Sequence, residues 1–272
     1  MATGRLPFSA SQVRRYFQRV GFQEHNSFSD LPPPTLHTVR RLIACHLQTI
    51  PFENLSLHYS THPQIFLGDA FLFDKMVDRR KGGYCMEQNT LFAGILRTLG
   101  YDLYTIGARV YLPNDSKSRY PSGIIHMAII VTINSVDYLV DVGFGGKGLT
   151  APLPVFDDTS MEVSIHGVLP EEHRLSRRPL SGGNKNGALP FVLECRNNPQ
   201  ARWEPLYIFQ RDFELFPADY EVYIVFNLTT NPQGSIHLRL NIPSLFLSTT
   251  FFARRSVSMR SWRPYHAQLY GM

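Results

Sequence analysis

Residues 79–100 read RRKGGYCMEQNTLFAGILRTLG, a glycine-containing turn followed by apolar residues at helical spacing. The pattern predicts a helix that begins near Cys85 and stops at Gly100. A thiol in the first helical turn meets unpaired N–H groups and the positive end of the helix dipole, which favour its thiolate. The same N–H groups can stabilise an oxyanion, so Cys85 is a candidate nucleophile. The competing interpretation is a small buried side chain, and this fits Cys45 and Cys195 better.

A nucleophilic thiolate needs a base, and two polar residues in apolar strands are candidates for its partners. His126 opens the apolar run HMAIIV, and Asp141 ends the run YLVD. A carboxylate in such a run is costly unless it is paired. The tight connection at Asn134-Ser135 predicts a hairpin that brings His126 and Asp141 to the same end. We therefore predict a triad in which Cys85 is the nucleophile, His126 the base and Asp141 the group that fixes the imidazole tautomer.

Helical patterns precede Cys85, and β patterns follow its helix. Apolar spacing predicts two helices and a weaker third one, over residues 9–21, 35–50 and 69–78. β-Branched and aromatic residues predict strands at 103–111, 124–133, 136–142, 189–195, 204–210 and 220–228. Residues 157–188 show little periodicity and are expected to form an exposed connection. Helices first and strands after, without alternation, favour an α+β fold over a doubly wound sheet.

The positive charge of the chain is concentrated at its C-terminal end. The net charge is +5, from 27 basic and 22 acidic residues. Residues 233–272 contain five arginines and no Lys, Asp or Glu, so the remainder is balanced at 22 of each sign. The sequence therefore does not predict a basic groove, and no nucleic acid is expected as a partner.

No apolar run is long enough to span a membrane, no signal core is visible, and three cysteines are too few for a disulfide framework. We therefore expect a reducing, cytoplasmic location without membrane association.

Four segments of the chain resemble the arylamine N-acetyltransferase family. KGGYCMEQN at residues 81–89 is similar to the family signature R-G-G-x-C-x-E-x-N. Three further similar segments lie in the family's order, at residues 50–55, 126–128 and 140–146. The resemblance covers residues 10–232 and implies an α+β, cysteine-proteinase-like core with an N-terminal helical bundle, a central β-barrel and a C-terminal α/β lid.

The resemblance also implies domain limits and a reaction. The implied domains are a helical domain (1–84), the nucleophile helix with the β-barrel (85–190), and an α/β domain (191–272) that is atypical after residue 232. In the family's ping-pong reaction, Cys85 would take an acyl group from acyl-coenzyme A and pass it to the nitrogen of an arylamine or hydrazine. Some filamentous-fungal members, to which the chain is similar, prefer malonyl-CoA, so acetyl-CoA and malonyl-CoA are both expected donors. Each is a substrate, and no permanently bound cofactor is implied.

Individual positions carry further implications from the resemblance. Ser122 and Gly123 match family positions that contact coenzyme A. Ile125 and Phe144 match positions that line the acceptor pocket, although core packing is an equal alternative for Phe144.

Two departures from the family pattern affect these expectations. Lys81 replaces the signature arginine, which in the family pairs with the glutamate that matches Glu53. Lysine keeps the charge but loses the bidentate fork, so we expect a weaker brace. Beyond Pro232 the likeness fades, because residues 233–272 contain six serines, five arginines and no acidic residue. The hypothesis is an altered C-terminus that weakens acyl-donor binding while the triad stays intact.

Three other interpretations compete with the acyltransferase. The same triad serves a thiol hydrolase or a transglutaminase-like enzyme, in which water or another nucleophile meets the thioester. An inactive homologue with impaired coenzyme A binding, which binds a partner through its basic tail, is the second. A zinc site is the third, but a second thiolate at zinc-binding spacing is missing, so no metal is expected. The physiological amine, the donor and the oligomeric state are left open by the sequence.

Overall fold

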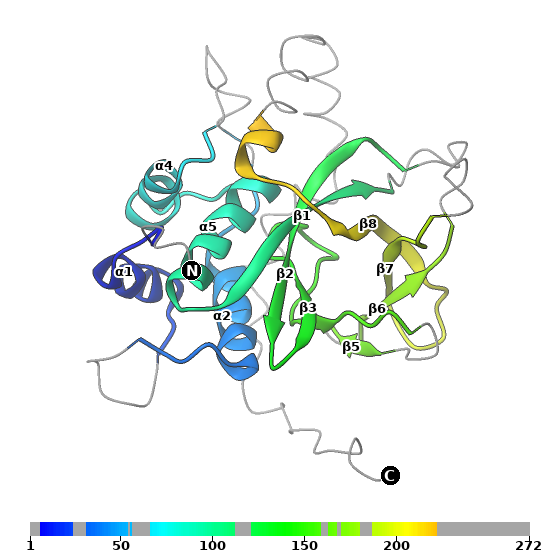
Figure 1. Ribbon diagram of the computed structural model, residues 1–272. Coiled ribbons are helices and arrows are strands. Elements are labelled where there is room, and N and C mark those ends of the chain that lie inside the picture. The colour runs from blue at the N-terminus through cyan, green and yellow to red at the C-terminus, as the bar shows by residue number, and fades with distance from the viewer. Residues whose placement is uncertain are drawn as a thin grey trace.

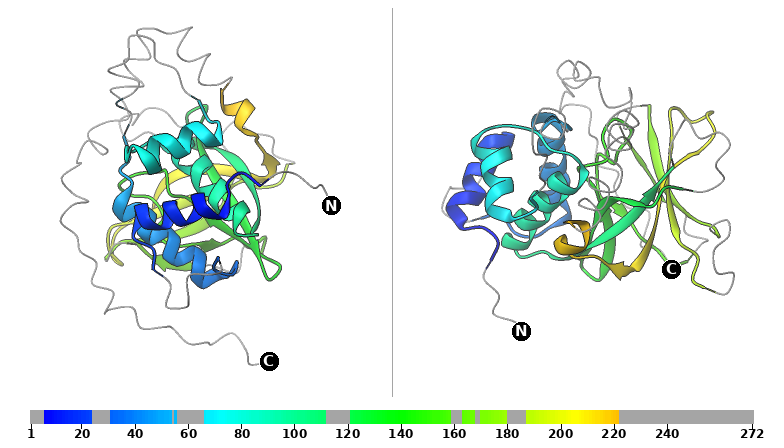
Figure 2. Two further views of the ribbon diagram at one scale, coloured as in Figure 1. Left: turned by 90° about the vertical axis from the view of Figure 1, so that its left-hand side faces the viewer. Right: turned by 90° about the horizontal axis from the view of Figure 1, so that it is seen from above.

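The computed structural model describes residues 6–23, 31–53, 55, 66–111, 121–158, 163–167, 170–179 and 187–221. Helices gather on one side of the molecule and an antiparallel sheet forms the other (Figures 1 and 2). The helical elements are α1 (Ala10–Val20), α2 (Leu36–Thr49), α4 (Asp69–Phe73), the π-helical turn η1 (Asp74–Asp78) and α5 (Cys85–Thr98). The strands are β1 (Asp102–Val110), β2 (Ile124–Ile133), β3 (Val136–Val140), β4 (Leu153–Pro154), β5 (Ser164–His166), β6 (Glu172–Arg177), β7 (Phe191–Arg196) and β8 (Glu204–Glu214). This arrangement confirms the predicted α+β class.

The first two helices begin and end where their capping residues predict. Ser9 and Gln12 form a reciprocal capping box at the start of α1, and Gly21 closes its end in the left-handed region at a φ of 71°. Thr35 caps α2 by accepting the Thr38 N–H at 3.2 Å. These caps use only local hydrogen bonds, which is why the sequence pattern located them.

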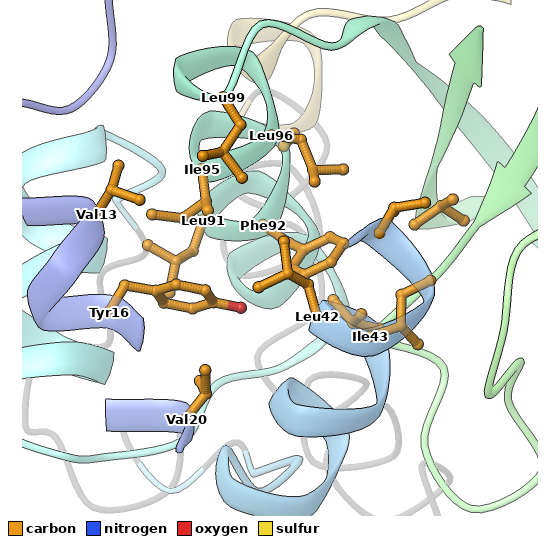
Figure 3. Close-up of a cluster of buried hydrophobic side chains, with 14 of the residues drawn as sticks. Val13, Tyr16, Val20, Leu42, Ile43, Leu91, Phe92, Ile95, Leu96 and Leu99 are labelled. Atoms are coloured by element: carbon orange, nitrogen blue, oxygen red, sulfur yellow. The ribbon is translucent and has the colours of Figure 1, made fainter. Parts of the chain in front are cut away.

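α5 is the centre of the helical layer and is buried along nearly its whole length. Side chains of α1 and α2 pack around it, with Tyr16 and Phe92 at the middle of the cluster (Figure 3). The same cluster includes Ile129 of β2 and Val140 of β3. A helix that is buried on all sides needs neighbours on all sides, so α5 ties the helical layer to the sheet.

The eight strands form one sheet in the order β4-β3-β2-β1-β8-β7-β6-β5, and every pairing is antiparallel. Asn134 and Ser135 both have positive φ, 50° and 63°, as a tight hairpin turn between β2 and β3 requires. The sheet curls into a barrel-like shape, because Leu153 of β4 and Ile165 of β5, at opposite edges, contact the same apolar cluster.

The expected exposed connection over 157–188 is wrong in part, because β5 and β6 lie within it. β6 reads EHRLSR and lacks an apolar alternation. Its charged side chains instead pair across the sheet, Glu172 with Arg196 and Arg174 with Glu194. The expected strand at 220–228 is also wrong at its first two residues, because residues 217–221 are helical. Residues 222–228 lie outside the described residues.

The three-domain division stays a prediction, but the sheet crosses its second boundary. β7 pairs with β6, and β8 pairs with β1, so strands from both sides of residue 190 are hydrogen-bonded together. Within the described part of the chain, no helix combines the length and apolar character needed to cross a bilayer.

His46 of α2 links the helical layer to the turn before Cys85. Its Nδ1 lies 2.9 Å from the Tyr16 hydroxyl and its Nε2 lies 3.0 Å from the Gln88 side-chain oxygen. The Gln88 amide in turn donates to the Gly83 carbonyl at 2.8 Å. Burial lowers the pKa of His46 to about 4, so the ring is neutral, accepts from Tyr16 and donates to Gln88.

We expect His46 to make the protein less stable as the pH falls from about 6.5 towards 4. The unfolded imidazole takes up a proton in this range and the folded one does not, so the stabilisation is complete above pH 6.5 and is lost below it. Between pH 7 and pH 5, the free energy of unfolding should fall by about 2 kcal/mol less in His46→Gln than in the wild-type protein. Urea unfolding of both proteins at the two pH values measures this difference, and an identical pH dependence would contradict the assignment.

Candidate active site

Cys85 is the first residue of α5 and is half-buried. The turn before it is held against the segment that follows α2. The Gly83 N–H donates to the Pro51 carbonyl at 3.2 Å, and the Glu53 N–H donates to the Gly83 carbonyl at 3.0 Å. A Cβ at Gly82 would lie 2.2 Å from the Pro51 carbonyl oxygen, so only glycine fits there. The turn therefore delivers the sulfur to the helix N-terminus in one fixed position.

His126 and Asp141 meet Cys85 from the hairpin side. The His126 Nε2 lies 2.7 Å from Asp141 Oδ2, and both side chains are buried. The Cys85 Sγ lies 3.6 Å from the carbonyl oxygen of Ile125, the residue before His126, and Cys85 is close enough to His126 to contribute to the raised pKa of that imidazole. Since Nε2 contacts Asp141, Nδ1 is the ring nitrogen available to the sulfur. The structure thus brings the three predicted triad residues together, while their catalytic roles stay a proposal.

The His126–Asp141 pair is charged at neutral pH. Burial of the ring opposes its protonation, but the Asp141 charge, their hydrogen bond and a smaller contribution from Cys85 outweigh burial and raise the pKa of His126 to about 10. Burial also opposes ionisation of Asp141, yet the attraction of His126 and hydrogen bonds to the carboxylate hold its pKa below the usual value. The site therefore contains an imidazolium that can accompany a thiolate.

Asn89 holds Asp141 in place, a role that the sequence pattern did not predict. Its Nδ2 donates to Asp141 Oδ1 at 2.9 Å and to the Met127 carbonyl at 2.7 Å, and its Oδ1 accepts the Val142 N–H at 3.0 Å. Asn89 thereby ties both strands of the hairpin to α5. It lies one helical turn after Cys85, on the same face, and this spacing was the available signal.

Two aromatic rings enclose the imidazole. The Phe144 ring packs edge-on against the His126 ring at 5.2 Å, and the Tyr207 ring lies 5.0 Å from His126. Burial, followed by the nearby Asp141 carboxylate, raises the pKa of Tyr207, so its phenol stays neutral. Tyr207 comes from β8, far along the chain, and sequence reasoning missed it. Phe144 packs against His126, and its predicted contact with an acceptor stays a prediction.

The remaining predicted site residues lie at the start of β2. Ser122 exchanges two hydrogen bonds of 2.9 Å with Val110, which anchor it beside the end of β1. Gly123 follows Ser122, and Ile125 is the residue whose carbonyl faces the Cys85 sulfur. Ile125 is thus in contact with the triad, while Ser122 and Gly123 lie just before it in the chain, and the contacts of all three with coenzyme A or an acceptor stay predictions.

The expected brace between Lys81 and Glu53 is wrong. Lys81 is exposed, and the described cation nearest to Glu53 is Lys75 of η1, whose Nζ lies 3.9 Å from Glu53 Oε1. Lys75 also contacts both carboxylate oxygens of Glu87. The cation beside Glu53 therefore comes from η1 and not from residue 81.

Cys85 is distinguished from the other two cysteines by its exposure. All three are free thiols, and Cys45 and Cys195 are buried. Burial raises the pKa of Cys45, and it raises that of Cys195 to about 11, which disfavours their thiolates. Among the described residues, no group of three or more His, Cys, Asp or Glu side chains is placed to hold a metal ion.

Comparisons with known proteins identify the family of the chain. A family model described as N-acetyltransferase matches residues 35–233. The chain is 31% identical over 263 residues to N-malonyltransferase FDB2 of Gibberella moniliformis, which covers 85% of this chain and 73% of that protein. It is 33% identical over 202 residues to an arylamine N-acetyltransferase of Mycolicibacterium smegmatis, covering 74% of this chain and 65% of that protein.

Solved structures show the same likeness. The arylamine N-acetyltransferase of M. tuberculosis superposes with a TM-score of 0.65 at 30% identity, covering 80% of this chain and 73% of that one. The Mycobacterium marinum enzyme in complex with CoA gives a TM-score of 0.64 at 31% identity, covering 79% and 70%. The fold and the family match define an acyltransferase with a cysteine-protease-like core. The chain belongs to the arylamine N-acetyltransferase family.

Close packing at Gly143 predicts that Gly143→Ala slows the acylation of Cys85. A Cβ at this position would lie 2.7 Å from the Cys85 carbonyl oxygen and 2.8 Å from Asn89 Nδ2, so the start of α5 and the segment after Asp141 must shift relative to each other. We expect a loss of about ten- to a hundred-fold in the rate of acylation by an acyl-CoA, measured by rapid quench and intact mass. Gly68→Ala is the control, because a Cβ there meets nothing within 4 Å. Equal acylation rates in the two variants would contradict the prediction.

Proposed function

We propose that this protein transfers an acetyl or malonyl group from acyl-coenzyme A to the nitrogen of an arylamine or hydrazine, through a thioester on Cys85. The observation that carries the proposal is a half-buried thiol at a helix N-terminus, 3.6 Å from the Ile125 carbonyl, next to an imidazole whose Nε2 lies 2.7 Å from a buried carboxylate. Membership of the acyltransferase family supports the class of reaction, and a CoA complex in a structural relative supports the class of donor.

The first half-reaction loads the acyl group onto the enzyme. The Cys85 thiolate attacks the carbonyl carbon of the acyl-CoA thioester, and the carbonyl π electrons move to the oxygen. The N–H groups in the first turn of α5 stabilise that oxyanion. When it collapses, the bond to the coenzyme A sulfur breaks, and the His126 imidazolium donates its proton to the leaving thiolate. Cys85 is then acylated and His126 is neutral.

The second half-reaction delivers the acyl group to the amine. The amine nitrogen attacks the Cys85 thioester, and neutral His126 accepts the proton that the nitrogen loses. Collapse of the tetrahedral intermediate breaks the bond between carbon and the Cys85 sulfur. The N-acylated amine leaves, and the thiolate–imidazolium pair is restored. Asp141 stays ionised and keeps the imidazole in the tautomer that presents Nδ1 to the sulfur.

A transferase must protect its thioester from water, and the walls of the site suit this task. The Phe144 and Tyr207 rings pack on His126, so the imidazole borders aromatic surface on two sides. Exclusion of water from such a site limits hydrolysis of reactive intermediates. We assign acceptor contacts to Phe144 and Ile125, and coenzyme A contacts to Ser122 and Gly123, at the mouth of the site.

The three free thiols also support a reducing, cytoplasmic location.

We expect acetyl-CoA or malonyl-CoA to leave one acyl group on wild-type protein and none on Cys85→Ala, as read by intact mass. His126→Ala and Asp141→Ala should acylate at least about a thousand-fold more slowly, because the triad acts as one unit. Thermal unfolding of each variant controls for the fold. Wild-type acylation rates in a folded His126→Ala or Asp141→Ala variant would refute the triad.

The same experiment separates the competing functions. Release of free coenzyme A that requires an arylamine such as p-aminobenzoate indicates transfer, and release that ignores the amine indicates a hydrolase. A third outcome is that saturating acyl-CoA leaves no adduct although iodoacetamide still alkylates Cys85. This outcome indicates impaired donor binding, as the atypical residues 233–272 predict. A chain whose Cys85 reacts with neither reagent is an inactive homologue.

A further inference from the structure

A buried ion pair lies directly behind the turn that carries Cys85. The Lys75 Nζ lies 2.7 and 2.8 Å from the two carboxylate oxygens of Glu87. The two side chains are only 5% and 4% exposed. Lys75 belongs to η1 and Glu87 to the first turn of α5, so the pair bridges the two elements that flank the turn.

Each partner also holds one end of that turn. The Lys75 carbonyl accepts the Lys81 N–H at 3.0 Å, and the Glu87 Oε2 accepts the Tyr84 N–H at 3.2 Å. Tyr84 is the N-cap of α5 and the residue immediately before the sulfur. A Cβ at Gly83 would lie 3.1 Å from Glu87 Cβ, so the glutamate packs directly on the turn. Movement of the carboxylate would therefore move the backbone that presents Cys85.

A gain in stability does not by itself explain why the charges of Lys75 and Glu87 are buried. Apolar side chains of similar volume in place of a buried ion pair are often neutral or stabilising. Burial raises the pKa of Glu87, and the Lys75 ammonium counteracts this, so the lysine helps to keep the carboxylate ionised. An ionised carboxylate accepts a stronger hydrogen bond from a backbone N–H than a neutral acid does. The distinctive effect of the pair is thus a firm orientation of the N-cap.

We propose that Lys75 is a positioning residue for Cys85, which holds the Glu87 carboxylate on the Tyr84 N–H and thereby fixes the sulfur beside His126. Lys75 acts on the sulfur through Glu87 and the turn, and it also lies 3.9 Å from Glu53 Oε1. The inference rests on the proposed function for its effect on acyl transfer, and it extends that function to a residue on η1.

The test neutralises the pair without removing the cap. In Lys75→Met/Glu87→Gln both charges are gone, but the glutamine oxygen can still accept the Tyr84 N–H. We expect iodoacetamide to alkylate Cys85 about ten-fold more slowly at pH 7, with a pH profile displaced from that of wild type. In acyl transfer, kcat should fall by a similar factor while KM for the amine changes little. Peptide mass spectrometry assigns the alkylated cysteine.

Two controls separate positioning from general damage. Lys75→Arg keeps the charge and should recover at least half of the wild-type alkylation rate. Arg174→Met/Glu194→Gln removes an ion pair whose Glu194 is equally buried, between β6 and β7, and should alkylate like wild type. A folded Lys75→Met/Glu87→Gln variant with the wild-type alkylation rate and pH profile would overturn the proposal.

Two further outcomes are also decisive. If the double variant does not fold, Lys75→Gln is measured in its place, and a folded Lys75→Gln with wild-type alkylation overturns the proposal. Failure of both to fold assigns the pair to stability and overturns it as well. Alkylation needs no acyl-CoA, so it tests the positioning role independently of acyl transfer. If wild-type Cys85 is never acylated, the proposed function is refuted, but the positioning role can still hold.

Discussion

The contact between His126 Nε2 and Asp141 Oδ2 places an imidazolium and a carboxylate together inside the protein. Each ion costs several kcal/mol to remove from water, so the pair persists only if its remaining hydrogen-bonding positions are filled. Asn89 and the Gly143 N–H both donate to the other carboxylate oxygen at 2.9 Å. The Cys85 sulfur then meets a cation whose charge and orientation are already fixed.

The fold supplies this arrangement by packing α5, the buried central helix of the helical layer, against the sheet. α5 carries Cys85 and Asn89 on one face, while its other faces pack into the helical layer. The hairpin of β2 and β3 brings His126 and Asp141 against that face. Glycine permits the closest approaches, at Gly82 under the turn and at Gly143 against the start of α5. The contacts that hold Cys85, His126 and Asp141 in place are therefore also contacts of the protein core.

Features set by local contacts could be predicted from the sequence, and features set by distant partners could not. The capped helices, the β2–β3 hairpin and the placement of Cys85 depend on turns and periodicity within short segments. β6 was missed because its polar residues are stabilised by partners on β7. Tyr207 and Lys75 were missed because their importance depends on contacts made only in the folded chain, with His126 and with Glu87. The family signature also led us to expect Lys81 as the partner of Glu53, whereas the structure supplies that cation from Lys75 of η1.

The central claim is that Asp141 keeps His126 protonated beside the sulfur, from neutral pH up to a pKa of about 10. The most direct test is a pH titration of the imidazole nitrogens by 15N NMR, with Cys85 unmodified. The account predicts imidazolium chemical shifts for His126 throughout the range from pH 6 to pH 9, and a lower midpoint in Asp141→Asn. A His126 ring that is already neutral at pH 7 in the wild-type protein would contradict it.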